Sequence, residues 1–316
     1  MKVFHKLEDL PAAGAGPSVA SVGNFDGVHR AHQLVLRHVV ERARELRAQS
    51  IAVTFDPHPA HILRPDMAPK LITPLPLKLK LLEATGLDAA LVIPFSRDFS
   101  VVTPAEFARH VLAECLHVVE VHEGANFHFG HKAEGNVERL REFARRLGFE
   151  VRVYPEMKIA GDLVSSSNIR ELLRLGKVGR ARRLLGRVFS ITATPGRGRG
   201  YGHKYTVPTI NLSRYEELLP GNGVYITRTR VNGETFDSVT NIGNRPTFGA
   251  ESFAVETHLL NFHSISLTAE TPVAICFFKR LREEIKFPSV EALREQIAKD
   301  VHRARRYFRL ADLSSS

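Results

Sequence analysis

Two histidines, His29 and His32, are the residues whose type and spacing point most directly to chemistry. They follow a short apolar run and a turn that contains Gly23, Asp26 and Gly27. If a helix starts after this turn, both imidazoles lie on one face of its first turn, where free N–H groups and the helix dipole favour a phosphate. The pattern predicts a phosphate site suited to attack on the α-phosphate of a nucleotide. The alternative is a surface helix whose histidines have no chemical role.

A strand, a turn and a helix are needed to position these histidines, and the first part of the chain alternates such elements. We expect strands over 18–23, 50–55, 89–95, 118–122 and 151–154, and helices over 30–48, 77–85, 104–116 and 136–147. This alternation predicts a parallel sheet with crossover helices. Ligands of such sheets bind at the carboxyl ends of the strands, where the polar turns of this half occur.

The pattern changes near residue 186. Residues 187–194 are strand-like and rich in β-branched residues, and a glycine-rich loop follows them. Turns at 220–223, 232–233 and 243–246 separate further short strand candidates, and a helix is expected over 290–301. Many short strands with tight turns predict an antiparallel barrel. We therefore place two domains at residues 1–185 and 186–316.

Composition and charge narrow the classes of protein. The 316 residues are 43% hydrophobic and 25% charged, which is typical of a globular protein, and no run of about 18 apolar residues predicts a membrane span. Cys115 and Cys276 are far apart and form no C-x-x-C pair, which favours the reducing cytoplasm and no disulfide framework. The net charge of +10 fits an enzyme of phosphorylated ligands, and also invites a nucleic-acid hypothesis.

The opening segment Gly23-Asn24-Phe25-Asp26-Gly27-Val28-His29-Arg30-Ala31-His32 resembles the nucleotidyltransferase signature G-x-F-D-G-x-H-x-G-H. With the motifs described next, it makes the chain similar to the bacterial bifunctional riboflavin kinase/FMN adenylyltransferases over nearly its whole length. The resemblance implies that residues 23–27 bind the nucleotide and that His29 and His32 are catalytic. Ala31 replaces the family's glycine, and its methyl group is expected to crowd a backbone that approaches a phosphate.

The segment Thr54-Phe55-Asp56-Pro57-His58-Pro59 matches a second family motif. Two prolines force the end of a strand into a turn here. The resemblance implies that Asp56 and His58 lie beside the nucleotide or the flavin. The alternative is turn chemistry alone.

The loop Gly124-Ala125-Asn126-Phe127-His128-Phe129-Gly130 resembles the family's flavin-site motif G-x-D/N-F-x-F-G. We expect Phe127 and Phe129 to face opposite ways, so that one packs inward and the other offers its ring to the isoalloxazine. Asn126 is suited to a hydrogen bond with a ring edge or a ribityl hydroxyl. The alternative is two core phenylalanines.

The stretch Val164-Ser165-Ser166-Ser167-Asn168-Ile169-Arg170 resembles the I-S-S-T-x-I-R motif of nucleotidyltransferases, with Ser167 in place of threonine. Hydroxyls before a helix cap it or bind phosphate oxygens. Arg170 is suited to neutralise charge that grows on the pyrophosphate leaving group.

In the second domain, Gly198-x-x-x-Gly202 leads to Thr209-Ile210-Asn211, which resembles the kinase family's glycine-rich flap and G-F-P-T-A-N pattern. Thr209 and Asn211 alternate along a strand, so their oxygens emerge on one face. Such a face beside nucleotide phosphates is a reasonable Mg²⁺ site, because Mg²⁺ takes few protein ligands plus phosphate.

Glu256 lies in Val255-Glu256-Thr257-His258-Leu259-Leu260-Asn261-Phe262, which resembles the kinase pattern V-E-x-H-L-L-D-F. The resemblance implies that Glu256 is the general base that takes the proton of the riboflavin 5′-hydroxyl. Without the family, a lone strand glutamate is usually a solvated residue.

Together these motifs predict a Rossmann-like parallel-sheet adenylyltransferase domain followed by an antiparallel Greek-key barrel with riboflavin kinase activity and a terminal helix. The expected reactions turn riboflavin into FMN and FMN into FAD, with ATP as second substrate and Mg²⁺ as cofactor. The expected partners are these small molecules, without nucleic acid or membrane, in the cytoplasm.

Two alternatives stay open. Thr206, Val207, Ile210 and Asn261 depart from the kinase pattern, so the chain is alternatively an adenylyltransferase with a weak or inactive kinase-like barrel. The charge and an arginine-rich run over 174–187 support, more weakly, a basic nucleic-acid-binding protein.

Overall fold

The structure, a computed structural model, describes residues 1–10, 16–196, 209–245, 252–263 and 265–313. It divides into two compact units, Met1–Asn168 and Ile169–Ser316. The division falls inside helix α6 (Ser166–Arg174), earlier in the chain than the 185/186 boundary expected from sequence. Helix α7 (Val178–Leu185) accounts for this difference, because it packs on two strands of the second unit, β11 and β16.

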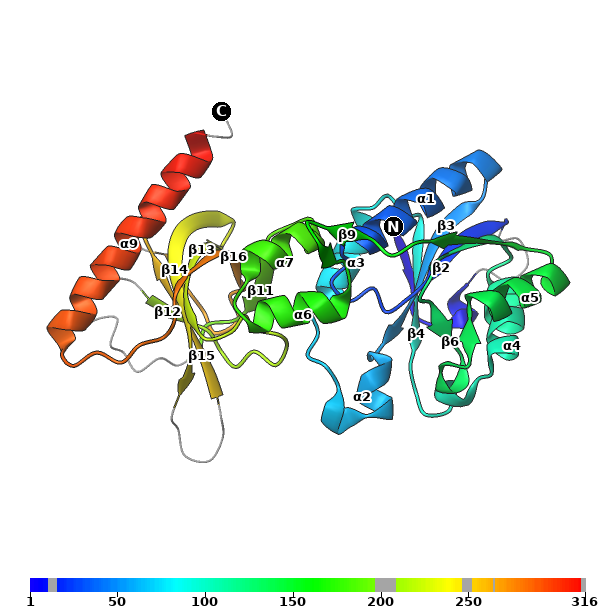
Figure 1. Ribbon diagram of the computed structural model, residues 1–316, viewed down its shortest axis with the longest axis horizontal. Helices are drawn as coiled ribbons and strands as arrows, with labels where there is room; N and C mark the ends of the chain where they lie inside the picture. Colours follow the sequence, from blue (N-terminus) through cyan, green and yellow to red (C-terminus); the bar gives the residue numbers. More distant parts are fainter. Residues whose placement is uncertain (11–15, 197–208, 246–251, 264, 314–316) are drawn as a thin grey trace. The chain divides into compact units, whose positions relative to one another are not determined.

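The first unit is built on six parallel strands in the order β1-β4-β3-β2-β5-β8. Figure 1 labels the strands β2, β3 and β4 of this sheet. Their bounds are β1 Lys2–Phe4, β2 Ser18–Val22, β3 Gln49–Asp56, β4 Ala89–Pro94, β5 Val118–Gly124 and β8 Glu150–Tyr154. The predicted parallel sheet is confirmed, and only β1 was absent from the sequence prediction. Strands β2, β3 and β4 are buried at nearly every successive residue because helices cover both faces of the sheet.

Two sets of helices enclose this sheet. Helices α1 (Arg30–Leu46) and α3 (Leu75–Glu83) form one hydrophobic cluster with Val19 and Ala52. On the other face, the helical segment that starts as α4 (Pro104–Glu106) and continues as the π-helix η4 (Phe107–Cys115) packs with α5 (Val137–Leu147). The sequence predicts an ordinary helix over 104–116, whereas the structure widens it, with Leu116 N–H donating to the Val111 carbonyl at 3.1 Å.

Short elements complete the first unit. They are the helix α2 (Pro59–Leu63), the hairpin of β6 (His128–Phe129) with β7 (Gly135–Asn136), and the hairpin of β9 (Lys158–Ile159) with β10 (Asp162–Leu163). Single helical turns occur at η1 (Leu7–Asp9), η2 (Pro65–Met67), η3 (Phe99–Val101) and η5 (His131–Ala133).

The strand order places a switch point beside β2. From β2 the chain moves through α1 to β3 and then β4, and it later returns to β5 on the other side of β2. The loops that leave the carboxyl ends of β2 and β5 therefore flank this switch point, which is where ligands of such sheets bind. The histidine loop follows β2, and the Asn126 loop follows β5.

The second unit is a six-stranded antiparallel sheet in the order β11-β16-β13-β14-β15-β12. The strands are β11 Phe189–Ala193, β12 Thr209–Asn211, β13 Gly223–Val231, β14 Glu234–Arg245, β15 Ser252–Leu259 and β16 Val273–Arg282. The sheet curls until its two outer strands meet, since Gly196 N–H donates to the Asn211 carbonyl and Ser213 N–H to the Thr194 carbonyl, both at 2.8 Å. This confirms the predicted antiparallel barrel.

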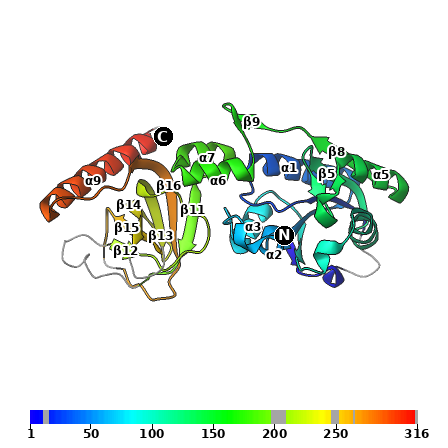
Figure 2. The same ribbon diagram turned by 60° about the horizontal axis from the view of Figure 1, so that its bottom comes forward.

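Helix α9 (Val290–Leu313) packs on the outer face of this sheet against β14 (Figure 2). Ala304 and Phe308 of α9 are buried with Val224, Ile226 and Val239 of the strands. The helix extends beyond the predicted 290–301 because its later turns carry these buried residues.

Hydroxyl groups occupy the other, inner face of β13, β14 and β15. Their oxygens form a closed ring, Thr227–Ser238–Thr229–Thr257–Thr240 and back to Thr227, in which neighbouring oxygens lie 2.7 to 3.0 Å apart. All five side chains are fully buried. Each hydroxyl has one hydrogen to donate, so a closed ring satisfies every member.

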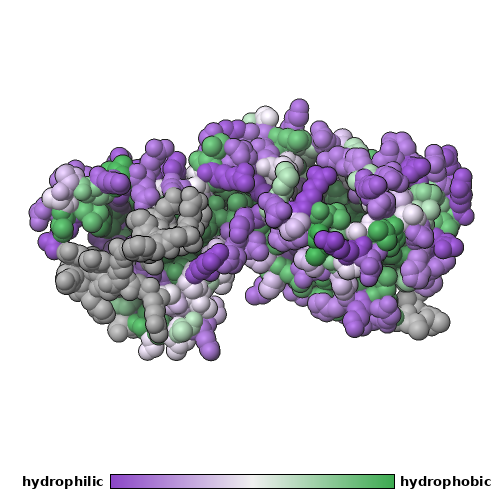
Figure 3. Space-filling view, turned by 90° about the horizontal axis from the view of Figure 1, so that it is seen from below, coloured by the Kyte–Doolittle hydropathy of each residue, from purple (hydrophilic) through white to green (hydrophobic). Residues whose placement is uncertain are grey.

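The face drawn in Figure 3 is mainly hydrophilic where its residues are described. Figure 3 shows purple residues over most of one face, with green hydrophobic residues in separate patches. Among the described residues, no helix is both long enough and apolar enough to cross a membrane.

Candidate active sites

The loop between β2 and α1 has an unusual backbone. Phe25, Gly27 and Val28 all adopt positive φ angles, 47°, 86° and 36°. Glycine tolerates this region, but a β-branched residue such as Val28 is strained in it, at a cost of about 1–3 kcal/mol. The surrounding structure must therefore hold the loop in place.

Asp26 supplies much of that support. Its buried carboxylate accepts hydrogen bonds from Ile72 N–H at 3.0 Å, from Thr73 N–H at 2.9 Å and from the Thr73 hydroxyl at 3.1 Å. The Thr73 hydroxyl oxygen accepts in turn from Gly27 N–H at 2.9 Å. Asp26 was predicted as a nucleotide-binding residue, and the structure shows its carboxylate bonded to the segment before α3.

Strand β3 holds the first half of the same loop. Gly23 N–H donates to the Val53 carbonyl at 2.9 Å, and the Thr54 hydroxyl donates to the Asn24 carbonyl at 3.3 Å. The Asn24 side chain is exposed, whereas Phe25 is buried and meets the ring of His32 edge-on, with ring centres 5.2 Å apart.

His29 and His32 stack on one another. Their ring centres are 3.6 Å apart and their planes are inclined by 16°. His29 is the N-cap of α1, and its Nδ1 accepts the backbone N–H of His32 at 3.4 Å. The expectation that both histidines lie together at the start of a helix is confirmed, with His29 one residue ahead of the helix.

The protonation of the pair follows from these contacts. Because Nδ1 of His29 accepts a hydrogen bond, its ring proton in the neutral form resides on Nε2, which is thereby a donor. Burial, the neighbouring His29 and the charge of Lys78 hold the pKa of His32 well below its usual value. The His32 Nδ1 is buried without a hydrogen-bond partner in the described part of the chain. A buried polar atom of this kind is costly unless a ligand satisfies it.

The serine segment joins the histidine loop. The Ser166 hydroxyl, at the start of α6, donates to the Asp26 carbonyl at 2.8 Å. Ser165 accepts the Asn168 N–H at 3.2 Å, as a helix cap does, and Ser167 is exposed. Arg170 lies four residues after Ser166 on α6, so the two side chains leave the same side of that helix.

The phenylalanines of the Asn126 loop correct one expectation. Phe127 and Phe129 do not face opposite ways: their rings stack, with centres 5.2 Å apart and planes inclined by 12°. Residues two apart in an extended chain point to the same side, which is the physical reason. Phe129 is buried against Phe107, Phe127 is partly buried, and Asn126 is exposed. The two rings therefore form one apolar stack beside the exposed amide.

Two acids and one histidine lie at other strand ends. Asp56 is exposed at the end of β3, and His58 caps α2 through an Nδ1 that accepts Ala60 N–H at 3.2 Å. At the end of β5, the buried Glu123 accepts Val22 N–H at 2.6 Å, in place of a backbone partner. Burial raises the pKa of Glu123 well above its usual value.

In the second unit, strand register aligns the predicted kinase residues. Asn211 on β12 lies directly opposite Glu256 on β15, and Thr209 lies opposite His258. Directly opposed residues of an antiparallel pair point to the same face, with Cβ atoms about 5 Å apart. Thr209, Asn211 and Glu256 therefore share a face and are all partly exposed. Gly198 and Gly202 lie outside the described residues.

Comparison with known proteins assigns both units. Residues 13–168 match the family model for FAD synthetase, and residues 185–308 match the model for riboflavin kinase. A bifunctional riboflavin kinase/FMN adenylyltransferase from Pseudomonas fluorescens is 34% identical over 306 residues, covering 96% of this chain and 97% of the relative. The chain belongs to this bifunctional family.

Further relatives of the same description agree. The Buchnera aphidicola subsp. Schizaphis graminum protein is 31% identical over 98% of this chain and 100% of its own length. A solved structure described as a macrolide-efflux protein from Streptococcus pneumoniae matches with a TM-score of 0.86 and 24% identity, over 96% of this chain and 98% of that one. This last likeness shows the shared fold alone.

Two of the departures from the family's kinase pattern lie among the described residues, and one of them points away from the oxygen-bearing face. Ile210 is buried and, since it lies between Thr209 and Asn211, points to the opposite face of β12. Asn261 is exposed in the turn after β15. Thr206 and Val207 lie outside the described residues.

Sequence reasoning did not single out three buried residues of the first site. Lys78, Thr73 and Glu123 were missed because nothing in their spacing marks them as buried beside the loop.

Asn241 of β14 lies opposite Glu256 and extends the same polar row. Burial and then the nearby Arg305 lower the pKa of His258 to about 4, so this imidazole is neutral at pH 7.

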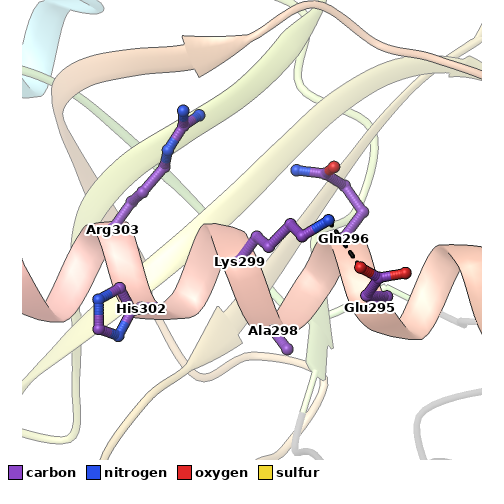
Figure 4. A pocket seen from close by; sticks show the side chains of 6 residues that line it. All are labelled: Glu295, Gln296, Ala298, Lys299, His302 and Arg303. Atoms are coloured by element: carbon purple, nitrogen blue, oxygen red, sulfur yellow. Dashed lines mark ion pairs between the residues drawn. The ribbon is translucent and has the colours of Figure 1, made fainter.

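A hollow on α9 is separate from these residues. Figure 4 shows the side chains that line it, Glu295, Gln296, Ala298, Lys299, His302 and Arg303. Lys299 Nζ lies 2.7 Å from Glu295 Oε1 across one helical turn. No predicted site residue lines this hollow.

Proposed function

We propose that the chain makes FAD from riboflavin in two ATP-dependent steps, with adenylyl transfer in residues 1–185 and riboflavin phosphorylation in residues 186–316. The observation that carries the first assignment is the stacked His29–His32 pair at the switch point of a parallel sheet, in which the buried Nδ1 of His32 lacks a hydrogen-bond partner among the described residues. The second rests on the oxygen-bearing row of Thr209, Asn211 and Glu256.

In adenylyl transfer, a phosphate oxygen of FMN forms a bond to the α-phosphorus of ATP as the bond to pyrophosphate breaks. The Nε2–H of His29 is the donor for an α-phosphate oxygen, and the unpartnered Nδ1 of neutral His32 is a second donor when it carries the ring proton. Both donors are fixed before the substrate binds, which spares reorganisation during the reaction.

The remaining residues of the first site bind and orient the substrates. The loop of residues 23–27 approaches the phosphates, while Ser165, Ser166, Ser167 and Arg170 bind the pyrophosphate that leaves. Asn126 and the stack of Phe127 and Phe129 receive the flavin, and Asp56 and His58 border the same crevice.

In riboflavin phosphorylation, the 5′-hydroxyl of riboflavin attacks the γ-phosphorus of ATP and ADP leaves. Glu256 accepts the hydroxyl proton. The hydroxyl and amide oxygens of Thr209 and Asn211 fit Mg²⁺, which takes oxygen ligands and keeps nucleotide phosphates in its shell. Bound there, the ion would neutralise phosphate charge.

An active kinase is favoured over a kinase-like barrel without activity. The buried Ile210 and the exposed Asn261 leave the row of Thr209, Asn211 and Glu256 intact. We also propose a cytoplasmic location, which the two free cysteines, Cys115 and Cys276, support.

One assay tests both steps. The purified chain is incubated with ATP and Mg²⁺ and with either riboflavin or FMN, and flavins are separated by chromatography. FMN and FAD from riboflavin, and FAD from FMN, are the expected products. FAD from FMN alone would leave only the adenylyltransferase, and no product from either flavin would overturn the proposal.

A further inference from the structure

Lys78 on α3 is buried to an extent that is rare for lysine. Its side chain is 3% exposed, and it is the only lysine among the buried residues of the described part of the chain. Lysine is almost never fully buried unless its charge is paired, because an ammonium loses its hydration in the protein interior. Burial accordingly lowers the pKa of Lys78 from its usual value.

The ammonium is connected to the histidine loop through one side chain. Lys78 Nζ donates to the Thr54 hydroxyl oxygen at 3.4 Å, and the Thr54 hydroxyl donates to the Asn24 carbonyl at 3.3 Å. Thr54 is itself fully buried. The chain of two bonds therefore runs from α3 through β3 to the loop that begins the nucleotide site.

Charged groups of the site surround the same ammonium. Asp26 and Asp56 act on Lys78 as favourable neighbours, opposing the lowering of its pKa by burial. The charge of Lys78 acts in turn on His32. The carboxylate of Asp26 is already bonded to Ile72 and Thr73, so Lys78 is not needed to complete its hydrogen bonds.

We infer that Lys78 is a positioning residue for adenylyl transfer: it holds the Asn24 carbonyl through Thr54 and places a fixed positive charge beneath the loop that binds the triphosphate. This inference rests on the proposed adenylyl transfer. Since the ammonium is buried, it acts on the pyrophosphate part of the nucleotide at a distance and not by contact. A lysine that served stability alone would affect the flavin substrate and the phosphate substrate equally.

The reverse reaction separates these roles, because FAD and pyrophosphate then bind as different substrates. We would measure the KM of each, and kcat, with the full chain and with Lys78→Met, which keeps the length of the side chain but removes its charge. Lys80→Met is the matched control, since Lys80 is an exposed lysine on the same helix. The expected result for Lys78→Met is a rise of about tenfold in the KM for pyrophosphate, with the KM for FAD changed by less than about twofold.

Thr54→Val provides a second variant that retains the charge and breaks the link to Asn24. It is expected to raise the KM for pyrophosphate by about threefold, and it carries the test if Lys78→Met does not fold. An unchanged KM for pyrophosphate in the folded variants, or equal rises for both substrates, would overturn the role of Lys78. If the unaltered chain forms no ATP and FMN from FAD and pyrophosphate, the proposed adenylyl transfer fails together with it.

Discussion

The two candidate sites are built in opposite ways. In the first unit the candidate residues lie beyond the ends of parallel strands, on a loop in which Phe25, Gly27 and Val28 adopt positive φ angles. In the second unit it lies on the face of antiparallel strands, where Asn211 stands opposite Glu256 by register. A strand-end site needs distant groups to hold its loop, whereas a strand-face site inherits its geometry from the sheet.

The supports of the first site show how distant these groups are. Thr73, Thr54 and Ser166 lie 47, 30 and 140 residues from the loop residues to which they bond, Asp26 and Asn24. Substitutions in any of several distant segments can therefore disturb a strand-end site. A strand-face site is disturbed mainly by substitutions in its own strands.

The largest expected effect is on the strand-face site. Glu256→Gln removes the proposed proton acceptor and keeps the shape of the side chain, so FMN formation from riboflavin is expected to fall by about 10³-fold. FAD formation from supplied FMN serves as the internal control and should stay unchanged, because Glu256 lies in the other unit. Parallel loss of both activities would show that the two sites are not independent. The measurement is the initial rate of each step.

His29→Asn tests the strand-end site without removing its helix cap. Asparagine caps helices as well as any residue, so the fold is expected to persist while the imidazole donor is lost. FAD formation should fall by about 10²-fold, with FMN formation retained. His29→Ala is the paired variant, expected to lose in addition about 1 kcal/mol of stability. Normal FAD formation in His29→Asn would show that the imidazole has no part in the reaction.

Glu123→Gln tests the buried glutamate at the strand-end site. Its raised pKa means that the folded state holds the proton more tightly than the unfolded state, so the stability of the unaltered protein falls as pH rises above about 4.5 toward the folded pKa. Glutamine keeps an oxygen for Val22 N–H and has no proton to lose. The variant is therefore expected to lose less stability than the unaltered protein as the pH rises from 5 to 8.

Urea unfolding of both proteins at pH 5 and pH 8 checks this expectation. The difference between the two pH values should shrink in Glu123→Gln. An identical pH dependence in the two proteins would mean that Glu123 is ionised in the fold.

The smallest expected effect is that of Ala31→Gly. Ala31 is the second residue of α1 and has ordinary right-handed helical backbone, so its methyl group needs no unusual conformation. Glycine should cost up to about 1 kcal/mol in stability and change FAD formation by less than about twofold. Thermal melting and the initial rate measure the two effects. FAD formation that is several times faster would show that the methyl group obstructs the nucleotide.

The same contrast explains how far the sequence could be read. Apolar runs and helical periodicity predicted both sheets and most helices, since these patterns express burial directly. The alternation of Thr209 and Asn211 placed their oxygens on one face, which strand geometry requires. The sequence therefore sufficed to predict which side chains share the face of the strand-face site.

For the strand-end site it predicted the pair of histidines and the serine segment, but not what holds them. The bonds from Asp26 to Ile72 and Thr73 and the burial of Lys78 arise from tertiary contacts that no local spacing records. The prediction that Phe127 and Phe129 face opposite ways was wrong, because residues two apart share a side of an extended chain and the two rings stack.

The closed ring of hydroxyls inside the barrel constrains how this sequence can change over time. Replacing one member, such as Thr229, by an apolar residue leaves two neighbours short of a buried bond, which costs about 1–3 kcal/mol for each unsatisfied group. Replacing all five together leaves no polar group stranded and is close to neutral. Proteins in which only some of the five hydroxyls are replaced are therefore less stable than proteins with the complete ring or with none of it. The effects of mutations at these positions on stability are strongly non-additive. A lineage keeps the ring whole or loses it through several nearly simultaneous changes.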